Sequence, residues 1–258
     1  MPGLKLFRLQ CSLPSLDLQK IMSALDCMPS LRVLSLWGVN PRYPGTNEGN
    51  SILMTEMDRT APITSLRLMC DNLRAQDLEQ FIRWPKTLTR FRLVGGIQSE
   101  PVADLPTLGN WLSIHKTTLR SIRIGSLALT TRGQLLDLTA FMSLETFSIQ
   151  PQVIRLPGGE FPYHDVHLLL GPKLHTFTLE HPLCAYQIDF GDVEEQWIRH
   201  LAKTATRLKS ALRWINIIWH VDDDNFGCLQ DRIDRLNRQT QVEVGMEHLG
   251  VAEYTGMD

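Results

Sequence analysis

The stretch Leu88-Thr89-Arg90-Phe91-Arg92-Leu93 carries the pattern that decides the fold of this protein. Apolar residues stand at its first, fourth and sixth positions, and a polar residue separates the last two, which is typical of a half-buried β-strand. The same spacing recurs along the chain with Leu, Ile or Phe at every apolar position. The eight occurrences are Leu4/Phe7/Leu9, Leu31/Leu34/Leu36, Ile63/Leu66/Leu68, Leu88/Phe91/Leu93, Leu119/Ile122/Ile124, Leu144/Phe147/Ile149, Leu174/Phe177/Leu179 and Leu212/Ile215/Ile217. The sequence therefore predicts an internal repeat whose units each begin with a short strand.

The repeats begin 27, 32, 25, 31, 25, 30 and 38 residues apart. These spacings are close to the roughly 20 to 29 residues of a leucine-rich repeat with insertions. Segments with helical spacing of apolar residues lie between the strands: 16–25, Leu78/Phe81/Ile82, Leu135/Leu138/Phe141/Met142 and Trp197/Ile198/Leu201/Ala202/Ala205/Leu208. We expect an α/β leucine-rich-repeat solenoid, curved, with parallel strands on the concave face and helices on the convex face.

The remaining segments complete this expected architecture. We expect one leucine-rich-repeat domain over 1–245, of about eight degenerate repeats, and a C-terminal tail over 246–258. Insertions rich in Gly and Pro at 41–50, 95–106 and 151–162 predict surface loops. A helix over 232–238 and a last strand over 242–244 would cap the C-terminal end. The alternative fold, separate βαβ units in a doubly wound sheet, requires a glycine-rich phosphate turn that this sequence lacks.

The first repeat begins almost at once, at Leu4. A solenoid needs a cover for the apolar flank and the unpaired strand edge of its terminal repeat. We therefore expect either that the chain is a fragment or a natural truncation, or that a partner covers this end. A dimer that pairs through the open edge is a further alternative.

The composition is that of an ordinary globular protein. Of the 258 residues, 43% are hydrophobic and 21% charged, and the formal net charge is -2, which gives no overall attraction to nucleic acid. The N-terminus does not resemble a signal peptide, and no stretch is long enough for a membrane span, so we expect an intracellular protein, cytoplasmic or nuclear, without a membrane partner. The five cysteines have no C-x-x-C pair and predict reduced, mostly structural thiols.

Three segments near the C-terminus resemble a known family. Residues 174–180 (LHTFTLE), 194–198 (EEQWI) and 209–215 (KSALRWI) are similar to the C-terminal half of filamentous-fungal F-box/leucine-rich-repeat proteins. In that family an N-terminal F-box docks to the Skp adaptor of a cullin ubiquitin ligase, and the repeats capture the substrate. The resemblance implies that the repeat surface recognises a protein substrate. It implies the Skp adaptor as a partner only if an F-box lies upstream, since none precedes the repeats in this sequence.

The outward positions of the predicted strands suggest where a partner binds. Side chains before, between and after the last two apolar residues of each repeat point away from the core, and the central position holds arginine in three consecutive repeats. The expected contacts are Trp37, Arg67, Met69, Arg90, Arg92, Val94 and Arg123. Arginine and tryptophan are enriched in binding hot spots, and arginine grips carboxylate or phosphate with two hydrogen bonds, so we expect an acidic or phosphorylated protein segment. The alternative is that these arginines pair with nearby acids or stay solvated. A nucleic-acid partner would need basic residues over a longer face.

No combination of residues predicts a catalytic site or a cofactor. His164 and His167 have the spacing of a metal-binding pair, which keeps a metal-dependent hydrolase as an alternative, but without a third ligand they are better interpreted as surface histidines. The acidic segment 220–225 lacks the glycine and the terminal glutamate of a calcium loop. The sequence has no Gly-x-Ser-x-Gly elbow, and Gly158-Gly159 indicates a turn. We therefore expect a binding protein that is not an enzyme, with a free-standing scaffold or inhibitor unrelated to ubiquitination as the alternative.

Overall fold

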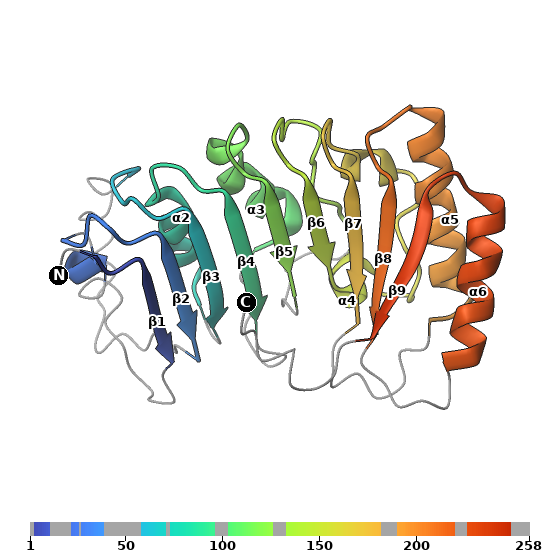
Figure 1. The fold of residues 1–258 in the computed structure, drawn as a ribbon, viewed down its shortest axis with the longest axis horizontal. Helices are drawn as coiled ribbons and strands as arrows, with labels where there is room; N and C mark the ends of the chain where they lie inside the picture. The colour runs from blue at the N-terminus through green and yellow to red at the C-terminus, as the bar shows by residue number, and fades with distance from the viewer. Residues whose placement is uncertain are drawn as a thin grey trace. The chain divides into compact units, whose positions relative to one another are not determined.

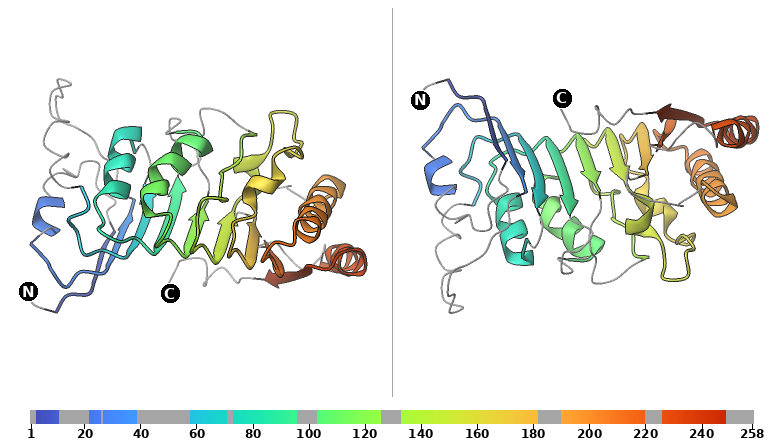
Figure 2. Two further views of the ribbon diagram at one scale, coloured as in Figure 1. Left: turned by 90° about the horizontal axis from the view of Figure 1, so that it is seen from above. Right: turned by 90° about the horizontal axis from the view of Figure 1, so that it is seen from below.

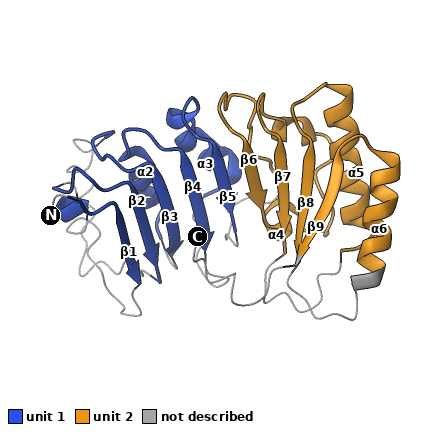
Figure 3. Ribbon diagram, viewed as in Figure 1, with its two compact units in different colours: residues 1–130 blue, residues 131–258 orange. Residues whose placement is uncertain are grey.

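The fold is described from a computed structural model of the 258-residue chain. The residues that it describes are 3–10, 22–25, 27–38, 58–70, 73–95, 103–125, 133–181, 190–219 and 226–248. The chain forms two compact units, Met1–Thr130 (unit 1) and Thr131–Asp258 (unit 2), shown in two colours in Figure 3. The boundary between the two units lies inside the range 1–245 that the sequence analysis expects to form one repeat domain.

The strands of unit 1 run parallel, and each pairs with the next one along the chain (Figure 1). They are β1 (Leu6–Gln10), β2 (Val33–Trp37), β3 (Ser65–Cys70), β4 (Arg90–Gly95) and β5 (Ser121–Ile124). Each lies on one of the first five predicted repeats. The register also follows the repeat, because Phe7, Leu34, Leu66, Phe91 and Ile122 form one line across the sheet.

Helices cover one face of the unit 1 sheet, as the two views of Figure 2 show. Residues 22–25 are helical, followed by α2 (Ala75–Arg83), α3 (Leu105–Leu112) and the 3-10 helix η3 (Ser113–His115). Leu78, Phe81 and Ile82 of α2 are buried, as their spacing predicted. Parallel strands with helices on one face agree with the predicted α/β class.

Residues 96–102 of the surface loop expected over 95–106 lie outside the described residues, as does the loop expected over 41–50. Helix α3 corrects the end of the 95–106 prediction. Leu105 and Leu108 are completely buried. The helix begins after Asp104, whose carboxylate accepts a hydrogen bond from the Thr107 amide at 2.7 Å, and Pro106 lies in its first turn. Aspartate at the N-cap and proline just inside a helix are start signals. The sequence analysis places Pro106 at the end of a loop, whereas in the structure Pro106 lies at the beginning of a helix.

Unit 2 repeats the same construction. Its strands are β6 (Thr146–Ile149), β7 (Thr176–Glu180), β8 (Trp214–Trp219) and β9 (Glu243–His248), parallel and paired in chain order. Its helices are α4 (Pro151–Ile154), the 3-10 helix η4 (Val166–Leu169), α5 (Asp192–Arg207) and α6 (Phe226–Gln239). The first three strands lie on the last three predicted repeats. The predicted closing helix and strand are both present and longer than expected, so β9 includes the first three residues of the expected tail.

The predicted apolar positions form the core. Of the 24, 21 are buried, and the three that are only partly buried are Leu4, Phe7 and Leu9 of the first repeat. A second repeating feature lies just before six of the strands, where one carbonyl accepts hydrogen bonds from two successive amides of the next repeat. The carbonyls of Lys5, Arg32, Thr64, Thr89, Glu145 and His175 do so. The repeat therefore determines the backbone bonding as well as the packing.

The segment around Leu135, Leu138 and Phe141 corrects a second expectation, because it contains no helix. All three side chains are buried, as their apolar character requires. The Leu138 amide, however, donates to the carbonyl of Leu168 at 2.8 Å, and the Asp137 carboxylate accepts from the Thr139 amide at 2.9 Å. A turn in which aspartate bonds the backbone two residues on competes directly with a helix.

The expected surface loop over 151–162 is wrong at its two ends, which contribute side chains to the unit 2 core. Val153, Ile154 and Phe161 are at most 1% exposed. The ring of Phe161 stacks on Trp197 with centroids 5.0 Å apart, and the Trp197 indole N–H donates to the carbonyl of Pro162 at 3.2 Å. Only the tip matches the prediction, since Gly159 turns the chain with φ +84°.

Candidate functional site

The expected binding residues of unit 1 lie on neighbouring strands in register. Arg67 pairs with Arg92, and Arg92 pairs with Arg123, across β3, β4 and β5. We call these three residues the arginine column. Neighbouring strands are about 4.8 Å apart, so the three guanidinium groups start from backbone positions that are very close. The side chains of the arginine column are half-buried, whereas Arg90 and Arg8 beside it are exposed.

The column lies on the outward face, which is the face of the β1–β5 sheet opposite the buried repeat residues. Leu66 and Leu68 are at most 1% exposed, while Arg67 between them points the other way, as strand alternation requires. The strands of unit 1 contain five arginines and no acidic residue. All the charged side chains on this face of the described strands are therefore cationic.

Arg67, Arg92 and Arg123 each already interact with another group in the folded chain. Three parallel cations at this spacing would otherwise repel one another. An anionic ligand on this face would therefore replace or join existing interactions. The alternative that the sequence analysis left open, arginines paired within the protein, remains compatible with this finding.

The expected apolar strip of Trp37, Met69 and Val94 runs beside the arginine column, but fewer of its side chains are exposed than expected. Trp37 pairs with Met69, and Met69 pairs with Val94. Met69 is 36% exposed and Trp37 is half-buried. The Trp37 indole N–H donates to the Ser35 hydroxyl at 2.8 Å, which folds the ring over a side chain that is only 1% exposed.

Val94 departs from the expected strip because it is only 7% exposed. Its side chain leans over Gly125, the residue that follows β5, where an added Cβ would lie 3.0 Å from a Val94 methyl carbon. Because Gly125 has no side chain, it leaves a space that the Val94 side chain fills. Trp37 and Met69 therefore form the exposed part of the strip.

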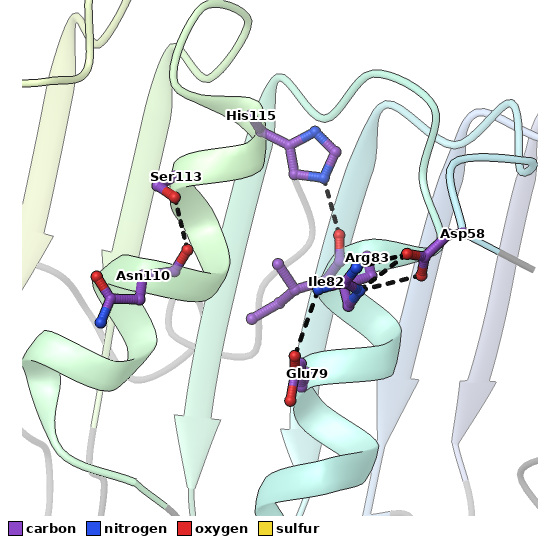
Figure 4. A network of polar contacts seen from close by, with 7 residues as sticks. All are labelled: Asp58, Glu79, Ile82, Arg83, Asn110, Ser113 and His115. Atoms are coloured by element: carbon purple, nitrogen blue, oxygen red, sulfur yellow. Dashed lines mark hydrogen bonds and ion pairs between the residues drawn. The ribbon is translucent and has the colours of Figure 1, made fainter. Parts of the chain in front are cut away.

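Polar contacts on the helix side of the unit 1 sheet stabilise the strands that carry the arginine column (Figure 4). Nδ1 of His115 accepts from the Leu88 amide at 3.4 Å, and Nε2 lies 2.8 Å from the carbonyl oxygen of Ile82. Burial lowers the pKa of His115, which is 1% exposed, so the ring is neutral and carries its proton on Nε2. It thereby connects the end of α2 to the start of β4.

Arg83, at the end of α2, binds the Asp58 carboxylate through two nitrogens at 3.0 and 2.6 Å (Figure 4). The hydrogen bond to Asp58 raises the pKa of Arg83. This pair fixes the segment that enters the third repeat to the helix that follows it. The arginine is structural and lies outside the candidate site.

The sequence analysis missed a group of side chains in unit 2. Trp214 is 48% exposed on β8, in register with the exposed Glu243 of β9. Glu247, two outward positions further along β9, accepts a hydrogen bond from the side-chain Nδ2 of Asn216 at 3.0 Å. Strand alternation would have placed all of them outward, but the last strand was predicted too short to include Glu247.

Two other outward residues of unit 2 are buried. Glu180 and Gln150 are 2% and 1% exposed, and the Glu180 carboxylate accepts a hydrogen bond from the Ser148 hydroxyl at 3.2 Å. Neither offers a surface to a partner. Alternation predicts the face on which a side chain lies, but its exposure depends on neighbouring groups.

The residues considered for other chemistry are not gathered together. His164 and His167 are both exposed. Among the described residues, no group of three His, Cys, Asp or Glu side chains could hold a metal ion. Segment 220–225 lies outside the described residues. Cys27 and Cys228 are exposed free thiols.

Comparisons with known proteins identify no relative. No protein-family model matches the chain, and searches of curated proteins and of solved structures find no significant match. In the described segments, none of the helices combines the length and the apolar character that a membrane crossing requires.

Proposed function

We propose that this protein is a leucine-rich-repeat recognition protein whose outward sheet face binds an acidic or phosphorylated segment of another protein. In this proposal the outward face is the concave face of a curved solenoid. The observation that carries it is the direct register of Arg67, Arg92 and Arg123 on three adjacent strands. Planar guanidinium groups bind carboxylate and phosphate with two hydrogen bonds each.

Two further features support this proposal. The described strands of unit 1 carry no carboxylate that would compete on the same face. The strip beside the column presents Trp37 and Met69, and flat aromatic and flexible thioether side chains supply apolar contact in protein interfaces. Together they fit an extended segment that carries acids on one side and apolar residues on the other.

A role as the substrate-binding part of an F-box ubiquitin ligase receptor is a narrower form of the proposal. It rests on the resemblance at 174–180, 194–198 and 209–215. Phe177, Leu179, Trp197, Ile198 and Ile215 in these segments are all buried. The resemblance therefore concerns packing more than surface chemistry. Binding of the Skp adaptor would distinguish this form from a free-standing scaffold or inhibitor.

The test is binding of fluorescent peptides, one of ten glutamates and one with two phosphoserines among apolar residues, measured by anisotropy. We expect an Arg67→Glu/Arg92→Glu/Arg123→Glu variant to lose affinity on the order of 100-fold, since each partly exposed pair contributes up to about 1 kcal/mol. A matched variant, Lys173→Glu/Lys203→Glu/Arg207→Glu, makes the same charge change at exposed positions of unit 2 and should keep its affinity. Equal binding by wild type and both variants would contradict the proposal.

A further inference from the structure

The charges on the sheets of the two units are of opposite sign. The five strands of unit 1 contain Arg8, Arg67, Arg90, Arg92 and Arg123 and no acidic residue. The four strands of unit 2 contain Glu180, Glu243 and Glu247 and no lysine or arginine. All eight occupy outward positions. Because Glu180 is buried, the exposed acids of the unit 2 sheet are on β9.

We propose that the outward face of β8 and β9 in one copy of this chain docks onto the arginine column of a second copy. The charge complementarity between these two faces is the reason to choose a second copy as the occupant. This inference rests on the proposed function, because it names the acidic partner of the same arginine face.

The β8–β9 patch, which we define as Trp214, Glu243 and Glu247, has the chemistry to receive arginine. Trp214 is 48% exposed, beside Glu243 in register, and a guanidinium group stacks on an indole ring while it pairs with a carboxylate. The side-chain Nδ2 of Asn216 already donates to the Glu247 carboxylate at 3.0 Å, which reduces the ordering cost when a partner binds. Between the two glutamates the outward residue is Gly245, so no side chain projects above the backbone there.

The spacing of the two faces is compatible. Glu243 and Glu247 are four residues apart on one strand, about 13 Å at about 3.3 Å per residue. Arg67 and Arg123 are two strands apart, about 10 Å at about 4.8 Å per strand. A β9 strand that crosses β3–β5 at nearly a right angle, as in orthogonal sheet packing, therefore brings one carboxylate near each outer arginine. Trp214 then lies close to the arginine that meets Glu243.

The experiment exchanges the charges of the two faces. One variant carries Arg67→Glu, Arg92→Glu and Arg123→Glu, and the other carries Glu243→Arg and Glu247→Arg. We expect wild type at low salt to have a molar mass of at least twice the 29.4 kDa of one chain in light scattering, because each copy carries both faces, and we expect each variant alone to be monomeric. Mixing the two variants, or combining all five substitutions in one chain, should restore association, because complementary faces are present again.

The mixture also controls for folding, because a misfolded variant would not be rescued by its counterpart. Should the arginine variant fail to fold, Trp214→Ala with Glu243→Gln, and the loss of wild-type association at 0.5 M salt, provide the same comparison. A wild type that stays monomeric at 0.2 mM and low salt would overturn the inference. It would also be overturned if the two variants fail to associate when they are mixed. Binding of a decalysine peptide by a monomeric wild type would likewise assign the β8–β9 patch to another partner.

The failure of this inference can be distinguished from failure of the proposed function. The Glu243→Arg/Glu247→Arg variant keeps the arginine column, so it should still bind the decaglutamate peptide. Peptide binding by a wild type that is monomeric leaves the proposed function standing and overturns only self-association. Absence of both peptide binding and self-association overturns both.

Discussion

Nε2 of His115 donates a hydrogen bond to the carbonyl oxygen of Ile82 at 2.8 Å, across two neighbouring repeats of unit 1. The second ring nitrogen accepts from Leu88, so both polar atoms of a completely buried ring are used only when the ring is neutral. Its position links the helix layer to the sheet that carries the arginine column.

We expect the stability of unit 1 to fall at mildly acid pH because of His115. The pKa of this ring is lowered by burial, so the unfolded chain takes up a proton at a higher pH than the folded chain. The contribution is complete above the ordinary pKa of about 6.5 and is lost as the pH falls below it toward the folded pKa. His115→Phe should remove this dependence and cost about 1–3 kcal/mol, because the Ile82 carbonyl and the Leu88 amide lose their partner. Thermal unfolding between pH 8 and pH 5 measures both effects.

His167→Gln, at an exposed position, is the control and should leave the pH profile unchanged. A pH profile of His115→Phe that matches wild type would show that another group is responsible.

Unit 2 should depend strongly on the Glu195 carboxylate. It binds Arg199 at 2.6 Å, Arg232 at 2.9 Å and Arg235 at 3.2 Å, and its side chain is 6% exposed. Glu195→Ala takes the shared carboxylate from three arginines and removes two of the described ion pairs between α5 and α6, while Arg232 keeps its pair with Asp192 at 2.6 Å. We expect a loss of about 2 kcal/mol, below the 3–5 kcal/mol of a fully buried pair because the arginines are partly exposed. Urea unfolding followed by circular dichroism measures it, with the exposed Asp231→Ala as control. Equal losses in the two variants would contradict a specific role for this cluster.

Three glycines near the 151–162 segment separate steric from backbone effects. At Gly133, φ is +82° and an added Cβ would lie 2.1 Å from a Leu156 methyl carbon. At Gly159, φ is +84° with open space, and Gly158 has neither constraint. We expect Gly133→Ala to cost about 2–4 kcal/mol, Gly159→Ala about 1 kcal/mol and Gly158→Ala less than about 0.5 kcal/mol. The order of the three melting temperatures tests this, and an equal effect at 133 and 159 would show that Leu156 moves aside freely.

Ser35 is expected to position Trp37 for binding. Its hydroxyl accepts the indole N–H at 2.8 Å, and it is too buried to touch a ligand. Ser35→Ala should therefore weaken binding of an acidic peptide with apolar residues by about 2- to 10-fold, the range of a lost neutral hydrogen bond. Binding of decaglutamate, which contacts only arginine in our proposal, should change less than twofold. Similar losses for both peptides would indicate general disruption of the sheet. Ser35→Thr, which keeps the hydroxyl, should retain affinity if the larger side chain fits.

The sequence predicted the strands and their outward residues because both depend on local periodicity. A strand alternates its faces every second residue, so the spacing of Leu88, Phe91 and Leu93 already determines that Arg90 and Arg92 point outward. The repeat then aligns these positions in neighbouring units, which made the register of Arg67, Arg92 and Arg123 predictable. The helices α2 and α5 were predictable for the same reason, since their apolar residues recur at helical spacing.

The connections were less predictable because competing local bonds and contacts between distant residues decide them. Leu135 to Phe141 have helical spacing, yet the Leu138 amide bonds to Leu168 of the next repeat. Segment 151–162 has the composition of a loop, yet Phe161 stacks on Trp197 far along the chain.

By itself, the sequence determined where the strands lie and which side chains share a face, because both follow from the period of the repeat. Only the tertiary structure decided which of those side chains are exposed. Val94 is buried because its side chain packs over Gly125, which follows the neighbouring strand β5, whereas Trp214 is 48% exposed. Exposure depends on the size and position of groups on other strands and helices, and these come together only when the repeats pack.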